Sequence, residues 1–187
     1  MNASCRLRQW VHTGAGLFAW TFGFFYSQIW LVLLSLIPAS IRAIQLWNEL
    51  RTPLWMEVVV ELSRVVLFVL IFARLENTTV RQLFRKEFRT GLHTRCVAYL
   101  KRSWPHNLIV QMIVFTILMY GLMNLLIDAF VNERTVEAVM GIAGFGHYEY
   151  EAASNSMVYF LKNMSIIPMT MVYIARMIGF GAKERFA

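Results

Sequence analysis

Long apolar stretches separated by short polar ones dominate this chain and limit what it can fold into. The first stretch contains no Asp, Glu, Lys or Arg from Gln9 to Ile41, and three more stretches follow. Charged residues make up only 16% of the 187 residues, whereas an ordinary soluble domain has about a quarter. Such blocks are typical of chains whose solvent is a lipid bilayer. We therefore predict an all-α integral membrane protein with a single membrane domain, residues 1–187.

The lengths of these stretches predict a bundle of four transmembrane helices, because about 20 apolar residues cross the hydrocarbon core as a helix. The predicted spans are residues 17–37, 54–73, 108–127 and 157–178. Pro38 should kink or end the first helix, because proline removes a backbone donor. Pro168 lies inside the fourth span, where neighbouring groups or water can bind the carbonyl that proline leaves free.

The basic residues predict how the chain is oriented. Most of the 18 lysines and arginines lie before the first span, between the second and third, or after the fourth. The positive-inside rule then places both termini and the loop 74–106 in the cytoplasm, with the loop 128–156 outside. The chain is compact, and its Asn-x-Ser/Thr sequences all fall outside the outer loops. We therefore expect a multi-pass protein of a bacterial plasma membrane.

Apart from Arg176 near the end of the fourth span, four charged residues fall inside the predicted spans. Glu57, Glu61 and Arg64 are spaced i, i+4 and i+7, which places them on one helix face. Lys162 in the fourth span lies at a similar depth, about 8–10 Å from the outer boundary at 1.5 Å per residue. A charge at this depth costs at least about 2.5–3.5 kcal/mol, so these groups should pair or face water. We expect Lys162 to bind Glu61 or Glu57, and Arg64 to pair with Glu61.

The loop 74–106 holds a second group of charges. Thr79 and Gln82 match a capping box, and apolar residues follow at helical spacing with an interruption at Gly91. This pattern predicts one or two basic amphipathic helices on the inner leaflet. The residues expected to contact anionic lipids or a cytoplasmic partner are Arg81, Arg85, Lys86, Arg89, Arg95, Lys101 and Arg102. We expect no nucleic-acid partner, because the positive-inside rule already explains this charge.

The sequence contains no recognisable catalytic pattern. GxSxG, HExxH, P-loop and GxGxxG motifs are absent, although these motifs identify only some enzyme classes. His147, Glu149 and Glu151 alternate along the outer loop, but three candidate ligands are too few to predict a metal site. We therefore expect no catalytic residue, no metal and no cofactor, with lipid modification as the enzyme activity that remains open.

Two functions compete for the charges inside the membrane. The favoured hypothesis is a non-catalytic subunit, regulator or immunity-type partner of another membrane complex, in which these charges form a structural clamp or a docking contact. The alternative is a small oligomeric transporter or channel in which they form the transport site. Residues 35–41 resemble residues 165–171 around a proline. Inverted repeats with broken helices occur in transporters, but such a match also arises by chance in an apolar chain.

Overall fold

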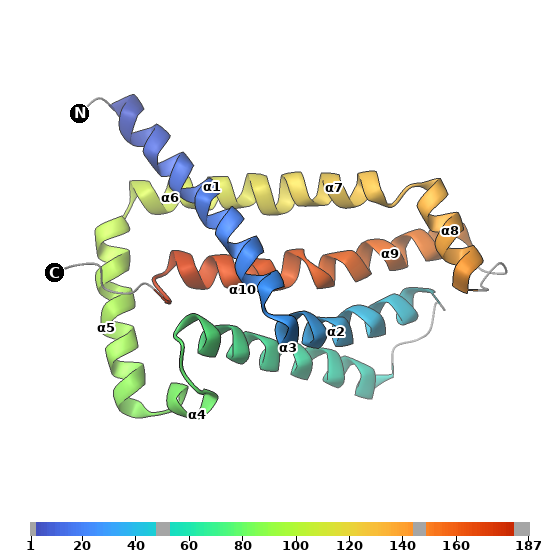
Figure 1. The fold of residues 1–187 in the computed structure, drawn as a ribbon, viewed down its shortest axis with the longest axis horizontal. Helices are drawn as coiled ribbons and strands as arrows, with labels where there is room; N and C mark the ends of the chain where they lie inside the picture. The colour runs from blue at the N-terminus through green and yellow to red at the C-terminus, as the bar shows by residue number, and fades with distance from the viewer. Residues whose placement is uncertain (1–2, 48–52, 144–148, 182–187) are drawn as a thin grey trace.

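The computed structural model describes residues 3–47, 53–143 and 149–181, and every element within these ranges is a helix. The elements are α1 (Ala3–Ser27), α2 (Ile29–Trp47), α3 (Leu54–Leu75), α4 (Val80–Leu83), α5 (Lys86–Ser103), α6 (His106–Phe115), the π-helical segment η1 (Thr116–Leu122), α7 (Met123–Phe130), α8 (Glu133–Ala143), α9 (Tyr150–Met164) and α10 (Ile166–Met177). Most of them run along the long axis of the molecule, whereas α5 crosses one end and α8 lies at the other (Figure 1).

Three helices are long and apolar enough to cross a membrane. They are Ile29–Trp47, His106–Phe130 and Tyr150–Met177. Large apolar side chains such as Trp30, Leu54 and Ile117 are exposed on the outside of the bundle, as expected of a surface that faces lipid. Helix α3 is also long and apolar, with 22 residues, but Glu57, Glu61 and Arg64 give its apolar stretch more charged residues than those of the other three.

The first helix differs from its prediction. We expected one span over 17–37, but the helix breaks at Gln28 inside that range, and α2 continues through Pro38 to Trp47. Of the two outcomes expected at Pro38, a kink or a helix end, the helix end is therefore wrong. The Gln28 carbonyl accepts the amides of Leu31 (2.9 Å) and Val32 (3.2 Å), so it caps the start of α2. In Figure 1, α1 approaches obliquely and α2 turns to run beside α3.

The last helix is also broken. It begins at Tyr150, within the range 128–156 that we expected to be a loop, and it is interrupted at Ser165, where φ is −126° and ψ is −72°. Pro168 lies in the turn after this break and has no amide to offer the Met164 carbonyl. The Tyr26 hydroxyl of α1 lies 3.4 Å from that carbonyl and donates to it. A neighbouring helix thus satisfies the free carbonyl, which is one of the two outcomes expected at Pro168.

The closest helix packing joins α2 to α9. Ser35, Ala39 and Ala43 recur every fourth residue of α2, and Ala153 and Ser156 face them from α9. Small side chains at this spacing let two backbones approach closely within a membrane. The Ser156 hydroxyl donates to the Ala43 carbonyl at 2.6 Å, which ties the two helices together directly.

The predicted basic segment folds as α4 and α5. The capping box is present, because the Gln82 amide donates to Thr79 Oγ1 (3.4 Å) and the Thr79 amide to Gln82 Oε1 (3.1 Å). The interruption expected at Gly91 is absent: α5 runs straight through it, and the break lies between α4 and α5. Helix α5 lies across one end of the bundle (Figure 1). Near this end, the Glu76 carboxylate accepts from Arg95 (2.8 Å) and from the Gly181 amide (2.7 Å).

Gly181 generates the first prediction. Its φ is +65°, and a Cβ there would lie 2.6 Å from the Leu75 carbonyl oxygen. We expect Gly181→Ala to destabilise the protein by about 1–3 kcal/mol, the range for a strained backbone conformation. Thermal unfolding in detergent micelles measures this loss. Gly121→Ala is the control, because a Cβ at Gly121 has nothing within 4 Å; equal melting temperatures for the two variants would contradict the prediction.

Candidate functional site

An open cavity of about 1190 Å3 runs along one face of α9 and the start of α10. Helices α2 and α3 contribute Arg42, Gln45 and Arg64 to its wall, and the η1–α7 run contributes Tyr120 and Asn124. The residues from α9 and α10, with the one preceding α9, are Glu149, Glu151, Ala152, Asn155, Tyr159, Lys162, Asn163, Ile166, Ile167, Thr170 and Met171. Charged, amide and hydroxyl groups thus lie together with apolar groups in one hollow between candidate membrane helices.

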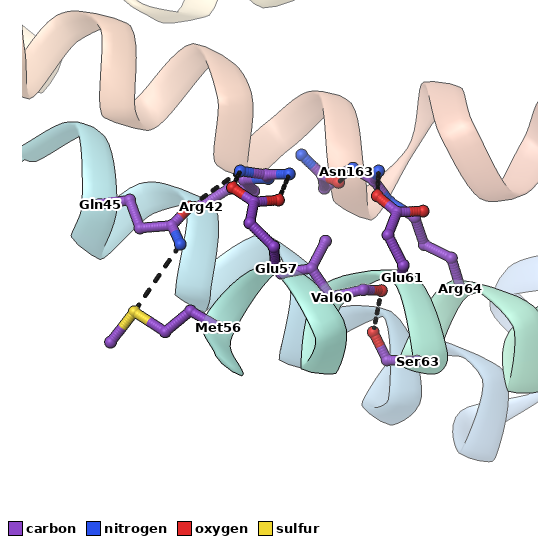
Figure 2. A network of polar contacts seen from close by, with 9 residues as sticks. All are labelled: Arg42, Gln45, Met56, Glu57, Val60, Glu61, Ser63, Arg64 and Asn163. Atoms are coloured by element: carbon purple, nitrogen blue, oxygen red, sulfur yellow. Dashed lines mark hydrogen bonds and ion pairs between the residues drawn. The ribbon is translucent and has the colours of Figure 1, made fainter. Parts of the chain in front are cut away.

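The Arg42–Glu57 ion pair joins α2 to α3 beside this cavity (Figure 2). The Arg42 guanidinium donates to both carboxylate oxygens of Glu57, at 2.6 and 2.5 Å, and also to Gln45 Oε1 at 3.1 Å. Two parallel bonds of this kind fix the relative orientation of the two groups. We had placed Arg42 in an outer loop and missed it as the partner of Glu57.

Arg64 connects α3 to α9. It donates to Glu61 Oε1 on its own helix at 2.8 Å, which is the pair that we expected, and to Asn163 Oδ1 at 3.0 Å. Figure 2 shows Arg64 extended from α3 toward Asn163. Asn163 is almost fully buried and also donates to the Tyr159 carbonyl at 2.8 Å. The contact expected between the second and fourth predicted spans is therefore made, through an arginine and an amide.

Lys162 does not form the pair that we expected. Glu57 binds Arg42 and Glu61 binds Arg64, while Lys162 makes no ion pair or hydrogen bond within the described ranges. The expected pairing of Lys162 with Glu61 or Glu57 is therefore wrong. Arg42, Arg64 and Lys162 lie in this region with Glu57 and Glu61, and the two ion pairs leave the charge of Lys162 over. Glu149 and Glu151 line the same cavity near the start of α9.

Further polar atoms of the cavity wall also lack partners in the described part of the chain. Asn124 Oδ1, Thr170 Oγ1 and Arg64 Nε are all buried without a hydrogen bond. Asn124 uses its amide nitrogen to bind the Tyr120 carbonyl at 2.6 Å, which leaves its oxygen over. Buried polar groups are nearly always hydrogen-bonded. Three such exceptions line this one cavity, which marks it as a place where an external partner could bind.

The cavity ends toward the α5 side of the bundle. Beyond Thr170 and Met171, the next residues of α10, Val172 and Tyr173, are fully buried. The Tyr173 ring packs against Phe115 with 4.9 Å between centroids. Its hydroxyl lies 3.2 Å from the Gln111 carbonyl and 3.4 Å from the Gly14 carbonyl. Beyond the end of the cavity, this contact packs α1, α6 and α10 together.

The basic residues expected to contact lipid or a partner lie away from the cavity. Those exposed on α4, on α5 and between them are Arg81, Arg85, Lys86, Arg89, Lys101 and Arg102. Arg95 is partly buried and holds Glu76. Burial raises the pKa of the nearby Cys96 thiol, and the charge of Glu76 adds to this effect while Arg95 opposes it. The structure thus separates a polar cavity from a basic surface at one end of the bundle.

Comparison with known proteins does not assign a function to this site. No family model matches the chain, and neither a characterised protein nor a solved structure matches it. Within the described ranges, no cluster of three His, Cys, Asp or Glu side chains is placed to hold a metal ion. His147, part of the alternating set considered above, lies outside those ranges. The function must therefore be argued from the cavity itself.

The Arg42–Glu57 contact predicts coupled effects on stability. Arg42→Met and Glu57→Gln should each lower the melting temperature in detergent, because each leaves the other group without its bidentate partner. The double variant should lose less than the sum of the two single losses, because it leaves neither charge behind. Glu137→Gln, on the exposed surface of α8, is the matched control and should change little. Additive losses in the double variant would contradict the pairing.

Proposed function

We propose that this chain is a small membrane transporter and that the cavity along α9 is its solute site. The observation that carries the proposal is the position of a cavity lined by Arg42, Arg64 and Lys162 beside helices that are interrupted along their length. The breaks at Gln28 and Ser165 face each other through the Tyr26–Met164 hydrogen bond. Interrupted helices beside a polar site are a recurring feature of secondary transporters, and irregular backbone at membrane depth is tolerated where it lines a cavity.

In this proposal four helical runs cross the membrane. These are the broken pair α1–α2, the charged helix α3, the run from α6 to α7, and the run from α9 to α10. Two charges of α3 are bound by neighbouring helices, Glu57 by Arg42 and Arg64 by Asn163, while Leu62 and Val65 are exposed to lipid. The positive-inside rule places α5 in the cytoplasm. The cavity then opens outward, and the Tyr173–Phe115 contact closes it toward the cytoplasm.

A second candidate function rests on Glu61. Its side chain is 61% exposed, and Val58, Leu62 and Val65 are exposed on the same side of α3. A carboxylate on an apolar surface at membrane depth is costly unless another group covers it. This exposure favours a chain that works as a subunit or regulator and that contacts a partner through α3. Native mass measurement in a mild detergent detects such a partner as a stoichiometric second protein.

Side-specific labelling of single cysteines separates the two functions. In a variant without Cys5 and Cys96, we expect Thr170→Cys at the end of the cavity to react with a membrane-impermeant thiol reagent added from outside. In inverted vesicles it should also react, more slowly, because a transporter exposes its site to each side in turn. Mass spectrometry of the intact protein measures both rates.

Two controls lie on the same helix. Val172→Cys is fully buried and should stay unmodified from either side, and Ile174→Cys, which is exposed on the apolar surface, should react only with a membrane-permeable reagent. A Thr170→Cys thiol that reacts from the outside alone would leave a binding site without transport and would favour the partner function. If the thiol of Thr170→Cys is as unreactive as that of Val172→Cys, water does not reach the cavity. That result would contradict both a transport site and a binding site there.

The orientation is tested at Cys96. In a Cys5→Ser variant, an impermeant maleimide should modify Cys96 in inverted vesicles and leave it unmodified in intact cells. Its raised pKa means that less thiolate is present at neutral pH, so the labelling rate should be lower than that of an ordinary thiol and should keep rising as the pH passes the ordinary cysteine pKa of about 8.5. Modification in intact cells would reverse the topology.

A further inference from the structure

The uncompensated charge of Lys162 points to the kind of solute that the cavity takes. Lys162 lies about 18 Å from the start of α9 at 1.5 Å per residue, close to the middle of the candidate span Tyr150–Met177. Both carboxylates of the region are engaged by arginines. An ammonium group at that depth costs at least about 2.5–3.5 kcal/mol when nothing neutralises it. The chain itself supplies no anion to Lys162 among its described residues.

We propose that the cavity binds an oxyanion, a carboxylate or phosphate group, with Lys162 as its principal contact. Arg64 follows along the same wall, held in place by Glu61 and Asn163. The Thr170 hydroxyl is a donor without a partner, and the Asn155 amide is exposed in the cavity. Charge-assisted hydrogen bonds from such groups are roughly twice as strong as neutral ones. The inference deepens the proposed function and rests on it.

The solute should also carry a hydrogen-bond donor. Asn124 Oδ1, which the η1–α7 run contributes to the cavity, is an acceptor without a partner among the described residues, and an ionised carboxylate or phosphate ester offers it no donor. A hydroxyl group next to the anionic group would satisfy it. The wall also includes Ile166, Ile167 and Met171, so an apolar portion is accommodated. A hydroxylated organic phosphate or carboxylate combines all three features.

The acidic residues at the other end of the cavity do not neutralise Lys162. Glu149 and Glu151 are exposed near the start of α9, and Glu151 lies eleven residues, or about 17 Å along the helix, from Lys162. That separation is about twice the Debye length of about 8 Å at physiological salt. These carboxylates lie at the opening of the cavity, where water screens their charge. They therefore do not neutralise the positive charge of Lys162.

The same oxyanion chemistry has two sources, a soluble phosphate or the headgroup of an anionic lipid that enters from the side. The purified full-length protein is compared by thermal unfolding with and without inorganic phosphate, at constant ionic strength. In a parallel set, it is placed in nanodiscs of phosphatidylcholine with and without phosphatidylglycerol. We expect one of these additions to raise the melting temperature. Stabilisation by phosphate identifies a soluble solute, and stabilisation by phosphatidylglycerol alone identifies a headgroup.

Variants assign the effect to the cavity. Lys162→Met should weaken the response by about tenfold in concentration or more, the loss expected for one hydrogen bond to a charged group, and Lys162→Arg should keep it. Asn155→Asp adds a negative charge to an exposed position in the cavity and should weaken the response even if Lys162→Met does not fold. Arg134→Met is the control, because it removes a cation from the exposed surface of α8, outside the cavity and outside the predicted lipid contacts, and it should respond like the unmodified protein.

The outcomes separate this inference from the transport proposal. If neither addition stabilises the protein, or if Lys162→Met and Asn155→Asp respond like Arg134→Met, the oxyanion site is overturned. Two-sided labelling of Thr170→Cys alongside that result would leave a transporter for a different solute. Lys162-dependent stabilisation with one-sided labelling would instead show an oxyanion site in a protein that does not transport.

Discussion

The contact between α2 and α9 is the interaction on which the rest of the structure depends. Ser35, Ala39 and Ala43 are small enough to bring the two backbones together, and the Ser156 hydroxyl bonds directly to the backbone of α2. Lipid tails give helices no hydrophobic reason to associate, so close packing and such hydrogen bonds supply the attraction. Because α2 lies this close to α9, Arg42, which directly precedes Ala43, lies at the edge of the cavity and within reach of Glu57.

Backbone hydrogen bonding explains how the helices can be irregular without losing this packing. A carbonyl in hydrocarbon needs a partner from the protein, and each break has one. The Gln28 carbonyl caps α2, and the Met164 carbonyl accepts from Tyr26. In the third run, the π-helical segment Thr116–Leu122 keeps the backbone bonded while it shifts the register of the following turns, and such segments are frequent at functional sites. Tyr120 of this segment and the following Asn124 line the cavity.

The apolar stretches predicted most helices, because length and hydropathy are properties of each segment alone. The i, i+4, i+7 spacing likewise predicted the Glu61–Arg64 pair. Pairings between helices could not be predicted in this way. A helix that ends at Pro38 would place Arg42 in a loop, where it is not recognised as a partner of Glu57. A short connection between two adjacent helices brings together residues at similar distances from it, and Arg42 lies five residues from the end of α2 while Glu57 lies three from the start of α3. The unpaired state of Lys162 could not be predicted from the residues around it in the sequence. It depends on Glu57 and Glu61 each binding an arginine instead.

The closed end of the cavity indicates where motion would have to occur. Opening it toward α5 requires Tyr173 to leave Phe115 and the carbonyls of Gln111 and Gly14. A Cβ on Gly14 would lie 3.0 Å from Val114, so α1 and α6 are too close there to slide past each other. Rotation of α1 about Gln28 meets less resistance, because the helical hydrogen bonds are already interrupted at that residue and hinges form where a few residues absorb the change. The break in the first apolar stretch, rather than its proline, is thus the part of the chain best suited to couple the closed end to the cavity.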